Sequence, residues 1–235
     1  MSPHRLTLDH APPAAGATFT IVGDEAWHAV AVKRVQPGDR VELLDGRGGV
    51  AAALVTATDK RKRDASVQVR IERVSHADPV SPRVEVWSAV PKADRAGQMI
   101  DQLAQTGAAL WRPLVADRSV TEVDHKVERL QRIATEASKQ CGRAWHMELG
   151  APATVAEAAK LASASAVVVA DAAGALPAHV PRAARLIVLI GPEGGFTAAE
   201  TDMLQAGGAV SLRLGPHVLR TETAAVAAVV ALLCR

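Results

Sequence analysis

Two glycine-proline stretches bring charged side chains close to a backbone that could bind a ligand. The first reads G-P-E-G-G-F-T at 191–197 and contains Glu193, and the second reads L-G-P-H-V-L-R-T-E-T-A at 214–224 and contains Arg220. Glycine lets backbone amides approach a ligand, and proline lowers the entropy lost when a loop is ordered. A surface role is the commonest interpretation of any single arginine, but Arg220 lies beside such a loop. We therefore expect the two stretches to form a paired ligand-binding structure.

The elements around these stretches should place both at one edge of a sheet. Each follows an apolar strand, predicted at 186–190 and 209–214, and ligands of open α/β sheets bind beyond the carboxyl ends of strands. Gly191 and Gly215 fall at these ends, where we expect positive φ angles. The helices that follow are predicted at 197–206 and 222–233; their N-terminal signals are a Thr197–Glu200 capping box, Thr221 as a cap and Glu222 at the positive end of the helix dipole.

Several common ligand motifs are missing from the sequence. No Lys-Ser/Thr follows the glycines, so the first loop is not a phosphate loop, and no G-x-G-x-x-G follows a strand. No His/Cys/Asp cluster has metal-ligand spacing, so no metal is expected. An ordinary strand-to-helix connection is the remaining alternative for residues 191–200.

The chain divides by pattern into two parts. Residues 1–74 hold short alternating runs between turns, which predicts a small β-barrel. Residues 75–82 are small and polar with two prolines and are typical of a linker. In 83–235, strands alternate with helices, which predicts a largely parallel sheet with helices on both faces. The strands are expected at 19–22, 40–44, 50–55, 67–71, 84–90, 110–115 and 166–170, and the helices at 23–33, 96–104, 127–139 and 154–162.

Composition limits the other function classes. The chain has 235 residues, is 49% hydrophobic and carries a formal net charge of +2, so any nucleic-acid surface must come from local basic patches. Cys141 and Cys234 are far apart and are interpreted as reduced thiols. No apolar run reaches the ~20 residues that span a bilayer, and the first residues lack the apolar core of a signal peptide. These features predict a soluble, cytoplasmic protein.

The two glycine-proline stretches together resemble the ribosomal RNA small subunit methyltransferase E family, whose members methylate uridine N3 and belong to the SPOUT superfamily. Further matching stretches occur in order along nearly the whole chain: H-A-V-A-V-K-R-V-Q-P-G-D-R-V-E-L-L-D-G-R-G at 28–48, P-K-A-D-R at 91–95, A-D-R-S-V at 116–120 and I-A-T-E-A-S-K-Q-C-G-R at 133–143. The resemblance implies an α/β domain with a C-terminal trefoil knot, preceded by a PUA-like barrel. It also implies a homodimer in which helix 222–233 packs at the interface; core packing explains that helix equally well.

The resemblance implies S-adenosylmethionine (SAM) as cofactor and one uridine of the small-subunit rRNA, near the decoding centre, as substrate. Arg220 would stabilise the uracil anion formed when N3 loses its proton, and Glu193 would orient the base or stabilise its loop. The cofactor would be held by Ile190, Gly191, Gly195, Leu214, Gly215, Val218 and Leu219. Basic positions expected to contact RNA are Lys33, Arg34, Lys60, Arg61, Lys62, Arg63, Arg118, Lys139 and Arg143, together with Gln140. For 60–63, a solvated charged loop is the alternative.

Three positions depart from the family pattern. Gly97 stands where a carboxylate is common, Gln105 replaces a usual Glu, and His217 replaces a usual Arg. They leave both cofactor loops intact but concern regions where substrate or dimer contacts form. Alternatives are therefore a SPOUT enzyme with another RNA target, such as tRNA or large-subunit rRNA, and a non-catalytic RNA-binding assembly factor with the same fold.

Overall fold

A computed structural model describes residues 4–61, 64–92, 94–119, 127–162 and 165–235. The chain divides into two compact units. Unit 1 comprises residues 1–79 and 138–146, and unit 2 comprises residues 80–137 and 147–235. The domain boundaries inferred from the sequence stay a prediction; in the structure the strand before the proposed linker continues to His76.

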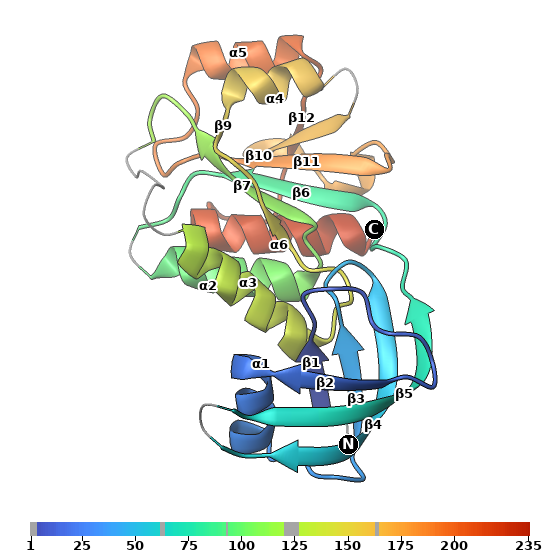
Figure 1. Cartoon of the computed structure of the whole chain (residues 1–235). Helices are drawn as coiled ribbons and strands as arrows, with labels where there is room; N and C mark the ends of the chain where they lie inside the picture. Colours follow the sequence, from blue (N-terminus) through green and yellow to red (C-terminus); the bar gives the residue numbers. More distant parts are fainter. Residues whose placement is uncertain (1–3, 62–63, 93, 120–126, 163–164) are drawn as a thin grey trace. The chain divides into compact units, whose positions relative to one another are not determined.

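Unit 1 is built on a curved five-stranded sheet with the strand order β1-β3-β4-β5-β2 (Figure 1). The two long strands, β4 and β5, each have eleven residues, and their pairing shifts register twice, between Ala52 and Ala53 and between Val55 and Ala57. Such irregularities increase twist and let a sheet curl around its core. Alternate residues of the strands point into that core, including Leu43, Val67 and Val69. The strands are β1 His4–Thr7, β2 Thr18–Val22, β3 Arg40–Leu44, β4 Gly49–Asp59 and β5 Ser66–His76.

The predicted helix at 23–33 differs in the structure. It begins as α1, Gly23–Trp27, and continues as the π-helical segment η1, His28–Val32. The wider turn is visible in the bond from the Lys33 amide to the His28 carbonyl, 3.0 Å long. Ala26, Ala29 and Val30 are buried along it, so the prediction of an apolar helical face is correct and the uniform α-helix is wrong.

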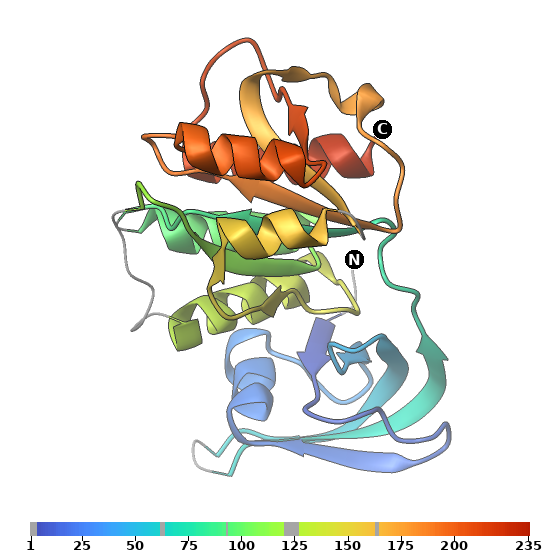
Figure 2. The same cartoon turned by 90° about the horizontal axis from the view of Figure 1, so that it is seen from above.

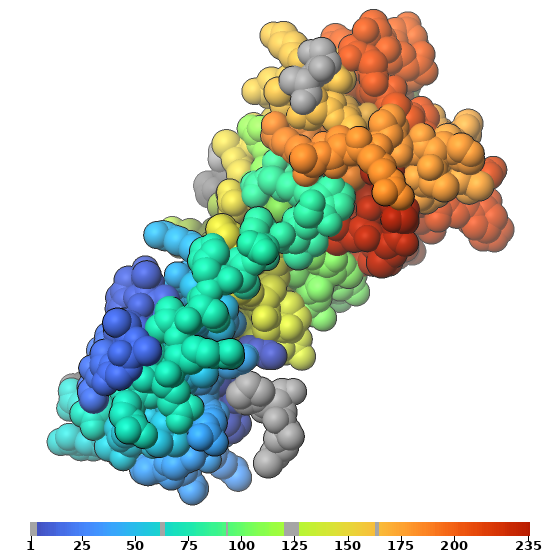
Figure 3. Space-filling model, turned by 90° about the vertical axis from the view of Figure 1, so that its right-hand side faces the viewer, coloured from blue at the N-terminus to red at the C-terminus, as the bar shows by residue number. Residues whose placement is uncertain are grey.

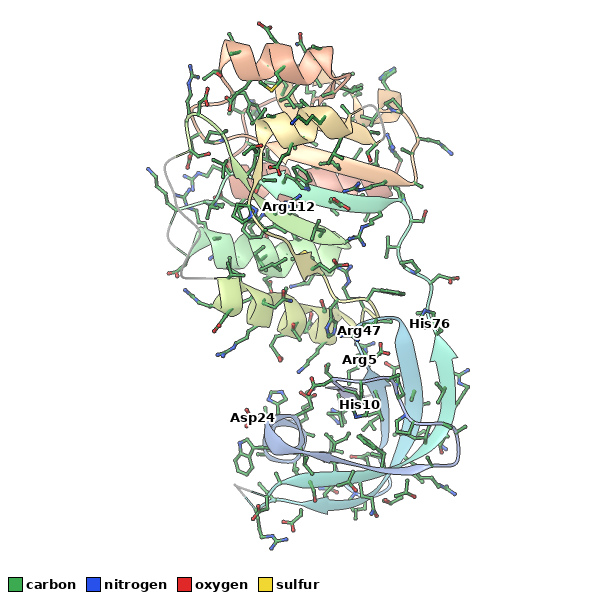
Figure 4. All side chains as sticks on the ribbon, turned by 45° about the horizontal axis from the view of Figure 1, so that its top comes forward. Arg5, His10, Asp24, Arg47, His76 and Arg112 are labelled. Carbon is green, nitrogen blue, oxygen red and sulfur yellow. The ribbon has the colours of Figure 1, made fainter. Side chains whose placement is uncertain are left out.

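Residues 138–146 pack on the β3–β4 turn of unit 1. The turn is closed by Asp45, whose carboxylate accepts from the amides of Arg47 and Gly49 at 2.7 and 2.8 Å. Backbone bonds join Gly48 to Ala144 and His146 to Gly46, and the Trp145 indole donates to the Ala77 carbonyl at 2.7 Å. This segment closes the hairpin end of the sheet, a long-range contact that local periodicity cannot reveal. In Figure 4, Arg5, Arg47 and His76 mark this part of unit 1.

Unit 2 is a parallel sheet covered by helices on both faces. Its main strand order is β12-β10-β11-β6-β7-β8, and β9 pairs with β7. Helices α2, α3 and α6 cover one face and α4 and α5 the other (Figure 1), with α4 and α5 in front of the strands in Figure 2. The strands are β6 Arg83–Ser88, β7 Leu110–Val115, β8 Glu148–Leu149, β9 Ala153–Thr154, β10 Ala166–Ala175, β11 Arg185–Ile190 and β12 Val210–Leu212, and the helices are α2 Arg95–Thr106, α3 Val127–Cys141, α4 Val155–Leu161, the 3-10 turn η2 Pro177–His179, α5 Ala198–Ala206 and α6 Thr221–Leu233.

The apolar runs of unit 2 become its two cores. Leu186 and Val188 face the helices α2, α3 and α6, whereas Ile187 and Leu189 face α4 and α5. Strand β11 is buried on both sides, which explains why its sequence is continuously apolar rather than alternating.

Strands β10 and β12 differ most from the predictions. The first extends to Ala175, and the second is limited to Val210–Leu212. Both Ala170 and Ala175 pair with Leu212, so residues 171–174 bulge out of the ladder. A Cβ on Gly174 would lie 2.6 Å from the Leu212 nitrogen, which explains the glycine by close backbone approach.

The far end of the sheet, where β6 and β11 begin, carries an ion network. Arg185 donates two hydrogen bonds to the buried Glu85 carboxylate, both 2.9 Å long, and Arg83 donates a third of 3.1 Å. Near the C-terminus, Arg235 donates to the carbonyls of residues 177–181, and Figure 3 shows the red end of the chain beside this orange segment. Among the described residues, no helix is both long and apolar enough to span a membrane.

Candidate active site

A cavity of about 500 Å³ lies where the chain leaves β10, β11 and β12. Both glycine-proline loops contribute to its wall. All nine residues that the sequence predicted for cofactor binding and catalysis line it: Ile190, Gly191, Glu193, Gly195, Leu214, Gly215, Val218, Leu219 and Arg220. The structure thus brings them to one cavity, and their individual roles remain predictions.

The first loop is shaped by close packing as well as by glycine flexibility. Gly195 has a φ of +69° and its amide donates to the Pro192 carbonyl at 2.8 Å. The expected positive φ at Gly191 is wrong; glycine is favoured there because a Cβ would lie 3.1 Å from the Phe196 ring, a tight contact. Gly215 also lacks a positive φ, and a Cβ there would meet nothing within 4 Å.

The predicted Thr221 cap is also wrong. Arg220 occupies the N-cap position of α6 without a side-chain capping bond, and Thr221 is the first helical residue. Its hydroxyl instead donates to the Gly191 carbonyl at 3.4 Å, so it links the second loop to the end of β11. Arg220 is exposed at the cavity, and its guanidinium has no hydrogen bond or ion pair within the described part of the chain. Glu222 lies in the first turn as expected, 3.5 Å from Arg95.

The capping box of α5 is confirmed and has a further partner. The Glu200 carboxylate accepts from the Thr197 amide at 2.8 Å, and the Thr197 hydroxyl accepts from the Glu200 amide. The other Glu200 oxygen accepts from the Asp117 amide at 2.9 Å. Arg118, beside it, donates to the Gly194 carbonyl at 2.6 Å. The turn after β7 is therefore bonded to the first loop.

Several polar residues of the cavity wall were not predicted from the sequence. The bulge in β10 supplies Asp171, whose carboxylate accepts from the Ala173 amide at 2.9 Å. The bulge depends on pairing between β10 and β12, so no local pattern could have located Asp171. The other polar wall residues not predicted as contacts are Thr201, Gln205, Ser211, His217 and Thr221.

Two family models match the chain, an RNA methyltransferase domain over residues 79–233 and an RNA methyltransferase PUA domain over residues 21–68. The ribosomal RNA small subunit methyltransferase E of Mycobacterium bovis is 33% identical over 229 residues, covering 92% of this chain and 86% of that protein. The chain belongs to this methyltransferase family. The Bacillus subtilis member is 31% identical, covering 88% of this chain and 86% of that protein.

A solved structure supports the same assignment. A Legionella pneumophila protein described as a methyltransferase, with SAM bound, matches with a TM-score of 0.85 and 26% identity over 100% of this chain and 98% of that one. The predicted fold class is confirmed as an α/β RNA methyltransferase domain preceded by a PUA domain. The SPOUT-type trefoil knot stays a prediction.

The basic residues predicted for RNA contact lie in different settings in this family member. Lys33 is half-buried and donates to the Arg5 carbonyl at 2.6 Å, whereas Arg34 is exposed with a φ of +57°. Arg61 pairs with Asp59 at 2.6 Å and Lys60 is exposed. Lys62 and Arg63 lie outside the described residues.

The predicted residues of α3 and its following turn belong to unit 1. The Lys139 ammonium lies 2.7 Å from the Glu25 carboxylate, and its side chain is only 13% exposed. Gln140 is exposed, and burial lowers the pKa of the Arg143 guanidinium. None of these three lines the cavity of unit 2. Among the predicted RNA residues that the structure describes, Arg118 alone is bonded to a cavity loop.

The three departures from the family pattern have distinct surroundings. Gly97 lies in α2, where a Cβ would be 3.2 Å from the Ile133 side chain of α3, so a larger residue would crowd that side chain. Gln105 donates to Asp101 one turn earlier at 2.8 Å. His217 lines the cavity and is the departure best placed to affect substrate choice. No group of potential metal ligands is present among the described residues.

Proposed function

We propose that this chain uses SAM to methylate N3 of one uridine in small-subunit rRNA, near the decoding centre, and that it acts in the cytoplasm as a homodimer. The observation that carries the proposal is the single cavity lined by both glycine-proline loops, with Arg220 and Glu193 on its wall. Membership of the methyltransferase family and the names of its relatives support the substrate class.

The volume and lining of the cavity suit a cofactor such as SAM. Small-molecule sites commonly have volumes of about 300–1,000 Å³, with apolar walls and a few polar groups. Ile190, Leu214 and Leu219 supply aliphatic wall, and the loop backbones supply amides and carbonyls for an adenine. When bound, SAM supplies a methyl group activated by a positive sulfonium. Asp171 and Glu193 are carboxylates suited to a cationic ligand.

Arg220 has the chemistry needed at uracil. N3 of neutral uracil carries a proton and becomes nucleophilic only when that proton is lost. A guanidinium beside the base stabilises the resulting anion. Arg220 is available for this role because its side chain makes no other bond in the described structure and follows the second loop directly. Holding N3 in line with the methyl group supplies most of the remaining acceleration. We assign Glu193 a role in shaping its loop ahead of a direct role on the base.

RNA contact requires cations that can reach phosphates. Arg34 and Lys60 are exposed and best meet this requirement, and the exposed amide of Gln140 can add a hydrogen bond. Lys33, Lys139 and Arg143 are more buried, so we propose for them a supporting role in which they shape the surface. The charged positions 60–63 are proposed as a further contact.

The dimer would use the less buried side of α6. Its buried face, including Ala225, Ala228 and Val229, already packs in the core of unit 2. Val230 is 43% exposed on the other side, next to the partly exposed Ala231. A second copy of the chain that covers this side would bury Val230. Sedimentation of the purified protein tests the proposed dimer. A monomer at micromolar concentration would contradict the proposal.

The deciding experiment is nucleoside mass spectrometry. Unmodified small subunits, naked small-subunit rRNA, large-subunit rRNA and tRNA are each incubated with protein and SAM. New N3-methyluridine at one small-subunit site is the expected result. Methylation of another RNA would point to a different target and direct attention to His217. SAM binding without methylation of any RNA, or no SAM binding, would favour the non-catalytic assembly factor.

A further inference from the structure

We propose that Arg118 is a positioning residue that holds the cofactor loop in its binding shape, rather than a contact to RNA. The inference rests on the proposed SAM-dependent function. It concerns the segment 191–197, whose residues Gly191, Glu193 and Gly195 line the cavity, whereas Gly194 and Arg118 do not. Arg118 thus contacts the loop at a residue outside the cavity lining.

The first observation is a close contact between Arg118 and Gly194. The guanidinium donates to the Gly194 carbonyl at 2.6 Å. The aliphatic part of the same side chain covers the glycine, since a Cβ on Gly194 would lie 3.2 Å from Arg118 Cδ. Gly194 has no positive φ, so the arginine's approach, and not backbone conformation, favours a glycine there.

The second observation is that Arg118, whose side chain is exposed, lies on a hydrogen-bonded turn. The Ser119 amide donates to the Ala116 carbonyl at 2.9 Å, and the Ser119 hydroxyl accepts from the Ala116 amide at 3.0 Å. Next to it, Asp117 is bonded through its amide to Glu200, which is 6% exposed. The loop is therefore anchored to the end of β7 at both Gly194 and the Thr197–Glu200 cap.

A loop anchored at two points loses less conformational entropy when it binds a ligand. Without Arg118, residues 191–196 would keep the internal bond from Gly195 to Pro192 and the bond from Thr221 to Gly191, but not the anchor at Gly194. Cofactor affinity should then fall although Arg118 does not touch the cofactor.

The test is a double-mutant cycle of Arg118→Ala and Gly194→Ala, with SAM affinity measured by calorimetry. Each single change should weaken SAM binding by about two- to tenfold, the size expected when one exposed hydrogen bond is lost. The double variant should be no weaker than Arg118→Ala alone, because a methyl at 194 has space once the arginine is removed. Arg132→Ala, which removes an exposed arginine on α3, should leave SAM affinity unchanged.

The competing role, contact with an RNA phosphate, makes opposite predictions. It requires Arg118→Ala to leave SAM affinity intact, to lower rRNA affinity and to reduce the salt dependence of rRNA binding by about one unit. That result, or additive effects in the cycle, would overturn the inference. If Arg118→Ala proves poorly folded, amide hydrogen exchange of residues 191–197 is compared between Gly194→Ala and wild type. Unchanged protection in the variant would show that the contact between Arg118 and Gly194 does not hold the loop. Failure of wild type to bind SAM would reject the proposed function instead.

Discussion

The Glu200 carboxylate accepts a hydrogen bond from the Asp117 amide at 2.9 Å, joining residues 83 positions apart in the sequence. The same carboxylate caps α5 through the Thr197 amide. One buried side chain therefore fixes the start of a helix and the turn after a distant strand.

This dual role predicts a large effect of Glu200→Ala on stability. The substitution removes two part-buried hydrogen bonds to a carboxylate, from the Asp117 and Thr197 amides, and a hydrogen bond to a charged group contributes about 1.5–3 kcal/mol. Urea denaturation should show a loss of about 2–4 kcal/mol. The matched control is Glu157→Ala in the exposed capping box of α4, which has only the local Thr154 partner and should cost about 0.5–2 kcal/mol. Equal losses in the two variants would contradict the role of Asp117.

The Glu85 network predicts acid sensitivity. Burial alone would raise the pKa of Glu85, but hydrogen bonds from Arg185 and Arg83 outweigh it and hold that pKa below its ordinary value of 4.5. Because the folded pKa is lower than the unfolded one, the unfolded state binds more protons as pH falls. The stability contribution is present above about pH 4.5 and is lost as pH falls through the folded pKa.

Melting temperatures measured from acid to neutral pH check this sign. The melting temperature of wild type should fall as the pH is lowered below about 4.5. Glu85→Gln should have a lower melting temperature at neutral pH and a smaller decrease on acidification. An equally large decrease in the melting temperature of the variant would show that other carboxylates cause the loss. Asp202→Asn removes the charge of an exposed carboxylate on α5 and should show the same pH dependence of the melting temperature as wild type.

Arg220→Ala should lower the single-turnover methylation rate by about 10²–10³, the range for removing one electrostatic donor from a reacting site. SAM affinity should change by less than about threefold, because the residue is assigned to the uracil anion. Helix α6 should remain, since Arg220 makes no side-chain capping bond. Arg220→Lys should recover part of the rate. A turnover within a fewfold of wild type would reject the assignment.

Gly174→Ala should weaken the pairing of β10 with β12. A Cβ at this position meets the Leu212 backbone at 2.6 Å, and overpacking of this kind costs about 1–3 kcal/mol. Gly215→Ala is the control, because a Cβ at that position would have no neighbour within 4 Å, and its stability should stay within about 0.5 kcal/mol of wild type. Denaturant midpoints compare the two; a stable Gly174→Ala would mean that the bulge adapts.

Arg34 combines exposure with a φ of +57°, a conformation that costs a side chain roughly 1 kcal/mol and that glycine adopts freely. Strain of this kind often persists at functional positions. Arg34→Gly should therefore raise the free energy of unfolding while lowering rRNA affinity and reducing the salt slope by about one unit. Arg34→Ala should also bind rRNA more weakly, but its free energy of unfolding should not rise. If Arg34→Gly binds rRNA with an unchanged salt slope, Arg34 makes no phosphate contact.

Much of this protein follows from local sequence. The run Leu186–Ile190 predicts a buried strand because five consecutive apolar residues suit a strand covered on both faces, and the structure buries them all. The Thr197–Glu200 box predicts the start of α5 because its bonds join residues three apart. The paired loops and their family resemblance predict a set of cofactor and catalytic residues, and every member of that set lines the cavity.

Only the tertiary structure decided the contacts between distant segments. The bulge that brings Asp171 to the cavity arises where β10 meets β12, and Thr221 bonds to Gly191 instead of capping its own helix. Arg118, expected to contact RNA from its position in a motif, bonds to Gly194, 76 residues away. Local periodicity encodes which face of an element is buried. It carries no information about which backbone carbonyl a polar side chain will meet, because that depends on the order in which strands pair in the sheet.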